Sequence, residues 1–315
     1  MFSGGSALAV IQIDGLRKEY RRLRGGSTLA LAGLDLEVPE GGVFGFLGPN
    51  GAGKTTTIRC LLGLVRPSRG RMRLLGADLP ADLPSVIRRV GSIVETPAFF
   101  PRFSGRRNLR LLARLHGVGL RAVDDVLERV GLADRADDLV KNYSLGMKQR
   151  LGVGAALLGD PEVLILDEPA NGLDPAGIVE VRELLRSLGA EGRSVFVSSH
   201  ILSEIQQIAD RVAILSRGVC VTAGPVDEVL SAGRATGLIV RLGDLPAGVR
   251  ALAEAGIGAS VDGDALRVSL PASEAANVTR VLADRGLYLS ELRPEEVDLE
   301  TVFLELTAEE PREPA

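Results

Sequence analysis

Residues 48–55, GPNGAGKT, follow the pattern Gly-x-x-x-x-Gly-Lys-Ser/Thr between a compact apolar run and a helix-forming run. Glycines let successive backbone N–H groups curl round a phosphate, and the start of the following helix adds a partial positive charge. In such a loop the lysine reaches the β- and γ-phosphates and the hydroxyl residue ligates Mg²⁺. An accidental glycine turn before a lysine is the alternative, but both flanks disfavour it. The predicted nucleotide-binding residues are Gly48, Pro49, Asn50, Gly51, Ala52, Gly53, Lys54, Thr55 and Thr56, with Thr55 also a metal ligand.

Two carboxylates end the apolar run VLILDEP, residues 163–169. Four consecutive apolar residues predict a strand in the middle of a sheet, so both carboxylates lie at its carboxyl end. Asp167 is predicted to join the metal shell through a Mg²⁺-bound water, and Glu168 to polarise an attacking water as general base. A plain Asp-Glu turn before Pro169 is the alternative, which the phosphate loop makes less attractive.

His200 ends a further apolar run, SVFVSSH, and is therefore expected at the same edge of the sheet. A lone histidine is usually a surface residue or a hydrogen-bonded polar residue. Its position at a strand end in a nucleotide-binding sheet favours a catalytic role as a sensor of the γ-phosphate.

The turn YSLGMKQR, residues 143–150, offers no nucleophile beside a base and no set of metal ligands, yet it comes directly before an apolar helix. Ser144 and Gly146 precede helical N–H groups that form an anion site. A second phosphate site so far along the chain from Lys54 makes sense if it covers a nucleotide held by another copy of the chain. A simple helix cap by Ser144 is the alternative, and the two roles are compatible.

Apolar periodicity and turn signals divide the chain into two predicted domains, residues 1–230 and 231–315. The first alternates strands with helices around the phosphate loop and contains a helix-rich stretch after residue 108. Its predicted strands lie at 8–13, 34–38, 43–47, 71–76, 91–95, 163–167, 194–199, 212–215 and 219–224. Its predicted helices lie at 56–65, 85–90, 108–118, 121–132, 145–158, 175–188 and 201–210.

The second predicted domain has the element order β-α-β-β-α-β, which is the ferredoxin-like order. We expect strands at 237–242, 259–262, 265–270 and 287–292, helices at 247–256 and 273–286, then a short helix over LETVFLEL and a frayed acidic tail. No residue pattern in this part indicates a chemical site, so a regulatory or dimer-stabilising module is predicted.

Composition excludes several classes of protein. The net charge of −4 argues against a general nucleic-acid-binding surface. No apolar run approaches the roughly 18–20 residues of a membrane span, and the first residues lack the features of a secretory signal. Cys60 and Cys220 lie far apart in apolar runs, which predicts two buried thiols rather than a disulfide. We therefore expect a soluble protein that could dock on a membrane protein.

With these motifs in this order, residues 8 to about 230 resemble the nucleotide-binding subunit of ATP-binding cassette (ABC) transporters. The sequence YSLGM stands where the family has its LSGGQ signature. It matches at Ser144 and Gly146 and departs at Leu145 and Met147, and the Lys-Gln-Arg that follows is the usual continuation. NGLD, residues 171–174, resembles the D-loop, which implies that Asp174 crosses a dimer interface.

The resemblance also implies roles for two residues outside these motifs, Tyr20 and Glu95. Tyr20 stands where the family stacks an aromatic ring on adenine, although a tyrosine between charged residues could also be plain surface. Glu95, in GSIVETPAFFP, stands where the family has its Q-loop glutamine. Either residue type offers an oxygen to Mg²⁺ or to the attacking water, but Glu95 adds negative charge near the phosphates.

The segment that follows Glu95 holds Phe99, Phe100 and Phe103 in a chain with few aromatics. Buried packing is one interpretation, and the resemblance implies a docking surface for a permease helix. The variants GSIVETPAF and YSLGMKQR resemble the bacitracin-resistance branch of the family, and VDLETVFLELT resembles its drug-exporting relatives.

The resemblance implies an α/β P-loop NTPase fold of the ABC type. This fold has a mixed central sheet, an antiparallel β subdomain and a helical signature subdomain, here followed by the small α+β ferredoxin-like domain. It implies an ATP hydrolase that binds ATP and Mg²⁺, pairs with a second copy around two ATP molecules, and drives separate transmembrane permease subunits at the cytoplasmic face of the membrane. Export of a drug, antibiotic or peptide is the expected task.

The alternative is a soluble ABC ATPase that acts in DNA repair, in chromosome structure or on ribosomes. Residues 56–143 show no sustained heptads of the kind that repair and chromosome types insert. Ribosome-associated types carry two cassettes, whereas this chain has a single GxxxxGKT. The transporter subunit is therefore preferred, without nucleic acid as a partner.

Overall fold

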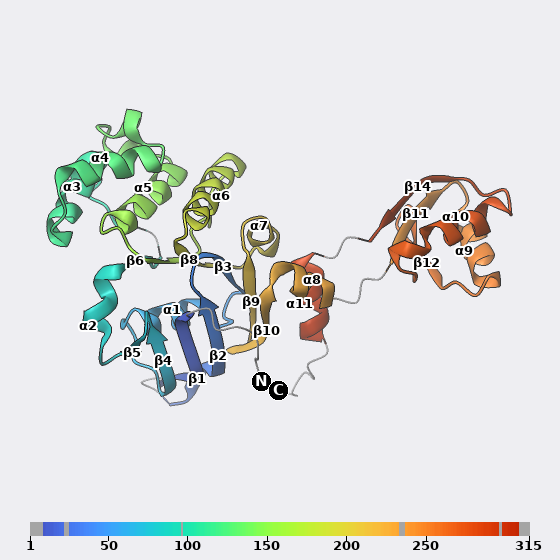
Figure 1. The fold of residues 1–315 in the computed structure, drawn as a ribbon, viewed down its shortest axis with the longest axis horizontal. Helices are drawn as coiled ribbons and strands as arrows, with labels where there is room; N and C mark the ends of the chain where they lie inside the picture. Colours follow the sequence, from blue (N-terminus) through green and yellow to red (C-terminus); the bar gives the residue numbers. More distant parts are fainter. Residues whose placement is uncertain (1–8, 22–24, 96, 233–236, 296–297, 309–315) are drawn as a thin grey trace. The chain divides into compact units, whose positions relative to one another are not determined.

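The computed structural model describes residues 9–21, 25–95, 97–232, 237–295 and 298–308 (Figure 1). The chain divides into two compact units. The described part of the first ends at Val229, and the second consists of Leu230–Ala308. We describe each unit by itself. Among the residues described, no helix has both the length and the apolar character needed to cross a membrane.

An antiparallel sheet forms one layer of the first unit, with strand order β2-β1-β4-β5. Its strands are β1 (Ala9–Arg21), β2 (Ser27–Pro39), β4 (Arg69–Leu74) and β5 (Ala77–Leu79). Two short strands were predicted here, at 8–13 and 34–38, but β1 and β2 are both longer. They stay paired through register shifts, one of them between Ile13 and Leu16. Such irregularities interrupt the apolar alternation and so hide the full length of a strand. Tyr20 lies in the part of β1 that the pattern missed.

A mixed six-stranded sheet with order β10-β9-β3-β8-β7-β6 forms the centre of the first unit. The strands are β3 (Gly42–Leu47), β6 (Val90–Ile93), β7 (Val163–Asp167), β8 (Ser194–Ser199), β9 (Arg211–Ser216) and β10 (Val219–Pro225). All are parallel to their neighbours except β10, which pairs antiparallel with β9 at the edge. Every residue of β7 and β8 is buried, as predicted from their apolar runs. The carboxyl ends of β3, β7 and β8 therefore meet at one edge of the sheet.

Helices pack around this sheet, and α3, α4 and α5 form a separate helical subdomain (Figure 1). The helices of the first unit are α1 (Lys54–Leu61), α2 (Leu83–Val86), α3 (Gly105–His116), α4 (Leu120–Arg129), α5 (Leu145–Leu157), α6 (Pro175–Ala190) and α7 (Leu202–Gln206). Helix α8 (Val226–Ala232), which the sequence pattern did not predict, spans the boundary between the two units. Short 3₁₀ turns lie at Ile87–Arg89, Ala133–Arg135 and Val140–Asn142.

The core of the first unit holds the phosphate-loop helix against the sheets. Phe196 of β8 packs against both aromatic rings of β3, with ring centroids 5.9 Å from Phe44 and 5.0 Å from Phe46. Each such ring contributes about 1.5–3 kcal/mol when fully buried. Cys60 of α1 lies in the same core, as predicted, whereas Cys220 is partly exposed, and both thiols are free. Burial raises the pKa of each thiol to about 11.

The second unit is a four-stranded antiparallel sheet with order β12-β13-β11-β14 and two helices. Its elements are β11 (Leu238–Leu242), α9 (Leu245–Glu254), β12 (Ala259–Asp262), β13 (Ala265–Val268), the 3₁₀ turn Ala272–Glu274, α10 (Ala275–Ala283), β14 (Leu289–Pro294) and α11 (Leu299–Ala308). The chain order and the strand order are those of the ferredoxin-like arrangement. Leu252 of α9 and Leu282 of α10 pack on Val240 and Leu266 of the sheet. The role of residues 231–315 as a separate accessory domain stays a prediction.

Candidate nucleotide-binding and hydrolysis site

The phosphate loop connects β3 to α1, and its glycines are needed for close packing. A side chain at Gly48 would place its Cβ 2.5 Å from the carbonyl oxygen of Leu215, on the neighbouring strand β9. Gly53, with φ of 109°, would place a Cβ 2.6 Å from Leu31 Cδ2. Residues with side chains rarely adopt such a φ and cannot approach so closely. The sequence therefore folds into a loop whose backbone is pressed against the sheets.

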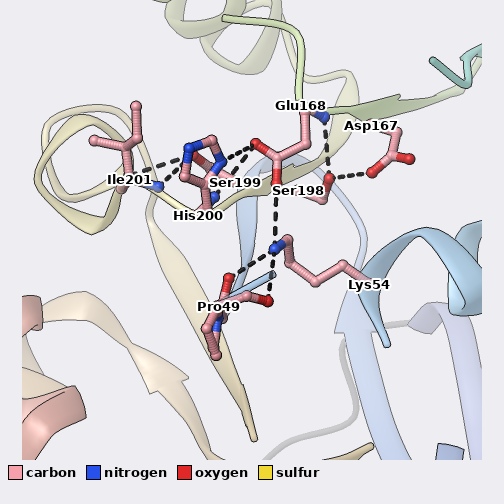
Figure 2. A network of polar contacts seen from close by, with 9 residues as sticks. Pro49, Lys54, Asp167, Glu168, Ser198, Ser199, His200 and Ile201 are labelled. Atoms are coloured by element: carbon pink, nitrogen blue, oxygen red, sulfur yellow. Dashed lines mark hydrogen bonds and ion pairs between the residues drawn. The ribbon is translucent and has the colours of Figure 1, made fainter. Parts of the chain in front are cut away.

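Lys54 is the first residue of α1, and its side chain is only 5% exposed. Its Nζ donates to the carbonyl oxygens of Gly48 (2.6 Å) and Pro49 (3.3 Å), and it lies 3.2 Å from Oε1 of Glu168 (Figure 2). A buried ammonium needs oxygen partners of this kind. The structure thus joins the phosphate loop to the end of β7.

Asp167 and Glu168 follow each other in the chain but have different partners. Asp167 is buried at the end of β7, and its Oδ1 accepts a hydrogen bond of 2.5 Å from the hydroxyl of Ser198. Glu168 turns away through a left-handed backbone conformation with φ of 49°. Its N–H donates to Oγ of Ser198 at 3.0 Å. The two carboxylates therefore point to different neighbours, which allows them different tasks.

His200 lies directly beside Glu168. Nδ1 of His200 is 2.7 Å from Oε2 of Glu168, and the backbone N–H of His200 donates to the same oxygen at 3.3 Å (Figure 2). The ring is therefore tied to the predicted base. Glu204, in the first turn of α7, interacts electrostatically with both residues. Burial raises the pKa of its carboxyl, Glu168 adds to this effect, and His200 and Arg182 oppose it.

The oxygens near the phosphate loop suit Mg²⁺. The Thr55 hydroxyl is partly exposed, and among the described residues no hydrogen bond joins it or Oδ2 of Asp167 to the protein. The neighbouring Thr57, by contrast, donates its hydroxyl proton to the carbonyl oxygen of Gly53 at 3.0 Å. Hydroxyl and carboxylate oxygens are the ligands that Mg²⁺ prefers, with waters and substrate phosphates completing its shell. Thr55 and Asp167 thus fit the predicted metal site.

Glu95 lies apart from this group. It follows β6 with φ of 65°, its side chain is 66% exposed, and it forms an ion pair with Arg59 of α1. In the part of the chain that the structure describes, no hydrogen bond or ion pair connects Glu95 with Lys54, Asp167 or Glu168. Its predicted contribution to the metal shell and to catalysis stays a prediction. The sequence pattern did not indicate Arg59 as its partner, because the two residues come from separate elements.

Residues 143–147, which resemble the family signature (the signature turn), and residues 171–174, which resemble the D-loop, lie side by side at the start of two helices. Ser144 caps α5, with its Oγ accepting from the N–H of Met147 at 3.2 Å, and Asp174 caps α6 by accepting from the N–H of Gly177 at 3.1 Å. A Cβ on Gly146 would lie 3.6 Å from Cα of Gly177. Leu145, the first residue of α5, is exposed. Within the described residues, no hydrogen bond or ion pair joins Ser144–Met147 to Lys54, Glu168 or His200.

Two predicted contact regions occupy exposed positions. Tyr20, on β1, is partly exposed, and Nζ of Lys18 lies 4.8 Å from the centre of its ring. Phe100 is 62% exposed and packs in a tilted arrangement against Phe103, with 5.2 Å between ring centroids. Asn108 of α3 holds this loop by accepting from the N–H of Phe100 at 2.9 Å and donating to its carbonyl at 3.1 Å. Buried packing alone therefore does not account for Phe100.

Ser198, whose hydroxyl joins the carboxylate of Asp167 to the backbone N–H of Glu168, was not predicted from the sequence. A signal was present, since two polar residues, Ser198 and Ser199, end a strand whose middle residues are Val195, Phe196 and Val197. A hydroxyl in a buried strand needs a partner, and the carboxyl end of a neighbouring strand supplies one. Only the register of β7 and β8, in which Asp167 pairs with Ser198, identifies that partner.

Comparisons with known proteins agree with these motifs. The model of the ABC transporter family matches residues 31–171. The chain is 46% identical to the bacitracin transport ATP-binding protein BcrA of Bacillus licheniformis, over 71% of this chain and 72% of that protein. It is 38% identical to the daunorubicin resistance ATP-binding protein DrrA3 of Streptomyces coeruleorubidus, over 96% of this chain and 97% of that protein. A solved structure of an ATP-binding subunit of an ABC transporter matches with a TM-score of 0.61 and 30% identity, over 71% of this chain and 92% of that one.

Proposed function

Because this chain belongs to the ABC transporter family of ATP-binding proteins, we propose that it hydrolyses ATP as the motor subunit of a transporter with separate membrane permease subunits. The observation that carries the proposal is the polar network at the edge of the central sheet. In it, Glu168 contacts both Lys54 of the phosphate loop and His200 at the end of β8.

ATP binds through the phosphate loop, where the N–H groups of Gly48–Thr56 and the start of α1 surround the β- and γ-phosphates. Lys54 is already held among oxygens, so it exchanges loop carbonyls and Glu168 for phosphate oxygens when the nucleotide binds. Thr55, and Asp167 through a bound water, would hold Mg²⁺, which would neutralise charge on the phosphates. Tyr20 offers its ring to adenine.

Hydrolysis depends on Glu168, whose carboxylate accepts the proton of the water that attacks the γ-phosphate. The contact with Nδ1 of His200 fixes one carboxylate oxygen, and release of Lys54 to the phosphates frees the other. His200 is then placed to respond to the γ-phosphate through the same residue. The different partners of Asp167 and Glu168 support this division between metal binding and base catalysis.

Two copies of the chain enclose two ATP molecules. Ser144 and Leu145 are exposed at the start of α5, where the Ser144 hydroxyl caps the helix, and Gly146 behind them is buried. The N–H groups of this helix start suit the γ-phosphate of a nucleotide held by a partner chain. Asp174 begins the neighbouring helix and lies at the same interface. ATP therefore closes the pair, and hydrolysis opens it.

The movement passes to a permease through the loop that carries Phe100, whose exposed ring is held in place by Asn108. The chain would then lie at the cytoplasmic face of the membrane through this contact. Relatives named for bacitracin transport and daunorubicin resistance support export of a drug, antibiotic or peptide as the task. These names do not favour a DNA-repair or ribosomal ATPase.

Two measurements test this function together. The purified chain is expected to hydrolyse ATP in the presence of Mg²⁺. The tagged chain, purified from detergent-solubilised membranes of its native host, is expected to carry a multi-spanning protein in near-equal amount by mass spectrometry. ATPase activity without any membrane partner, and with ribosomes or nucleic acid instead, would favour the soluble alternative. A chain that neither binds nor hydrolyses ATP would contradict both.

A further inference from the structure

Ser198 of β8 is a fully buried residue, with 0% of its surface exposed, and its hydroxyl joins the two acidic residues at the end of β7. The hydroxyl donates to Oδ1 of Asp167 at 2.5 Å and accepts from the N–H of Glu168 at 3.0 Å (Figure 2). The carbonyl oxygen of Ser198 also accepts from the same N–H at 3.2 Å. A hydroxyl has one proton to donate. Here Ser198 donates that proton to the carboxylate of Asp167, the predicted metal-site residue, and accepts from the backbone N–H of Glu168, the predicted base.

Packing alone does not explain a serine at this position. The three preceding residues of β8 are Val195, Phe196 and Val197, and an apolar side chain would satisfy a buried strand equally well. A buried hydroxyl is unfavourable unless its hydrogen bonds are made, and among the described residues this one bonds to Asp167 and Glu168 alone. The hydroxyl therefore serves the two acidic residues.

Glu168 needs this support because of its backbone. Its φ of 49° lies in the left-handed region, which is unfavourable for residues other than glycine unless the surroundings hold it there. Both oxygens of Ser198 hold the N–H of Glu168. This bend directs the carboxylate of Glu168 towards Lys54 and His200, while Asp167 stays in line with β7.

We infer that Ser198 is a positioning residue that ties the metal-side carboxylate of Asp167 to the backbone of the base, Glu168. With Oδ1 held by the hydroxyl, Oδ2 is the Asp167 oxygen left for the metal shell. The same hydroxyl holds the bend at Glu168, so both residues share one support. The inference rests on the proposed function, and it adds a residue that touches neither nucleotide nor metal.

Ser198→Ala removes the donor from Asp167 and one of the two acceptors from the N–H of Glu168. Loss of a residue that orients a metal ligand typically costs about 10–100-fold in metal affinity or activity. We expect Mn²⁺, used as a paramagnetic probe with ADP and followed by electron paramagnetic resonance, to bind Ser198→Ala about 10–100-fold more weakly than wild type. Binding of metal-free ADP in EDTA should change by less than about twofold, because among the described residues no hydrogen bond joins the Ser198 side chain to the phosphate loop.

Two variants keep this test free of folding effects. Ser194→Ala removes another buried hydroxyl from the opposite end of β8, where Ser194 accepts from the N–H of Gly41 at 2.8 Å, and should leave Mn²⁺ binding unchanged. Ser198→Thr keeps the hydroxyl and should restore Mn²⁺ binding to near the wild-type value. Thermal melting of all three variants identifies any that lose the fold.

The outcomes separate the inference from the function. Wild-type Mn²⁺ affinity in a folded Ser198→Ala protein overturns the inference, and so does an equal loss in Ser194→Ala. Weakened Mn²⁺ binding in Ser198→Ala alone, rescued by Ser198→Thr, supports it. A wild-type chain that binds Mn²⁺ and ADP without hydrolysing ATP contradicts the proposed function, while the Mn²⁺ comparison still decides the role of Ser198.

Discussion

The sheet edge and the signature turn are both predicted to hold the phosphates of ATP, but they are built differently. At the sheet edge, Lys54, Asp167, Glu168 and His200 are buried or partly buried and each contacts another member of the group or Ser198. At the signature turn, Ser144 and Asp174 are exposed, and within the described part of the chain their side chains bond only to the start of their own helices. One region is organised by the fold of a single chain, and the other faces outwards.

This difference indicates which parts of the site work within one chain and which need a second one. Groups that hold one another in a buried network are pre-oriented, so removing one disturbs its neighbours. Exposed helix caps make their hydrogen bonds within their own helix. Preventing their contact with a partner's nucleotide should therefore not destabilise the isolated chain. Substitutions at the two regions should therefore differ in size and in whether a second chain can compensate.

The largest effect is expected at the sheet edge from Glu168→Gln. The amide cannot accept a proton from the attacking water, so the rate of ATP hydrolysis should fall by about 10²–10⁴-fold. ATP binding should remain, and the ATP-bound pair of chains should accumulate in size-exclusion chromatography.

Glu162→Gln is the matched control, because Glu162 lies just before β7 and its carboxylate, among the described residues, pairs only with exposed Arg89. It should hydrolyse ATP at the wild-type rate. Wild-type turnover in Glu168→Gln would mean that another group is the base.

An intermediate effect is expected at the signature turn from Gly146→Ala. The added Cβ would meet only ordinary contacts of 3.6 Å or more, so the chain should fold and bind ATP. A methyl group at the point of approach to a partner's phosphate should lower the ATPase rate by about tenfold. Thermal melting and ATPase assays measure both.

Mixing variants tests whether this region acts on a second chain. Lys54→Ala alone should lose nucleotide affinity, since it removes the buried cation of the phosphate loop. An equal mixture of Lys54→Ala and Gly146→Ala chains should regain about a quarter of wild-type activity, because half of random pairs are mixed and each has one intact site. No recovery in the mixture would count against the shared site.

A small effect is expected from Glu95→Gln. The ion pair between Glu95 and Arg59 is exposed, and such pairs contribute about 0–1 kcal/mol. The variant also restores the residue that the family usually has, so activity should stay within about threefold of wild type. Complete loss of ATPase activity would instead reveal a role of this carboxylate in proton transfer, and Arg59→Gln would show whether the pairing matters to it.

The smallest effect is expected from modification of the two thiols, Cys60 of α1 and Cys220 of β10. With pKa values raised to about 11, Cys60 and Cys220 hold only about one thiolate in a thousand at pH 8, and the fraction rises tenfold per pH unit towards pH 11. Iodoacetamide at pH 8 should therefore leave ATPase activity unchanged and label neither residue rapidly by mass spectrometry. Both should react in urea, and rapid labelling of Cys60 in the folded chain would contradict its burial.

Much of the fold could be predicted from apolar periodicity, because strands such as β7 and β8 and helices such as α5 have strong local patterns. The exceptions have physical reasons. The alternation along β1 and β2 is broken where the register shifts, which concealed the strand around Tyr20. Helix α7 ends at Gln206, earlier than predicted, and α8 was not predicted at all. Short helices carry too few residues for a clear period.

The sequence by itself determined the chemical groups of the candidate site, because the glycine loop, the Asp-Glu pair and the signature turn are local patterns whose function depends on spacing along the chain. Only the tertiary structure decided which of these groups touch. Ser198 reaches Asp167, 31 residues earlier, because β7 and β8 pair in one particular parallel register. Glu95 meets Arg59 because β6 ends near α1. Contacts of this kind depend on how separate elements pack, and no local spacing encodes them.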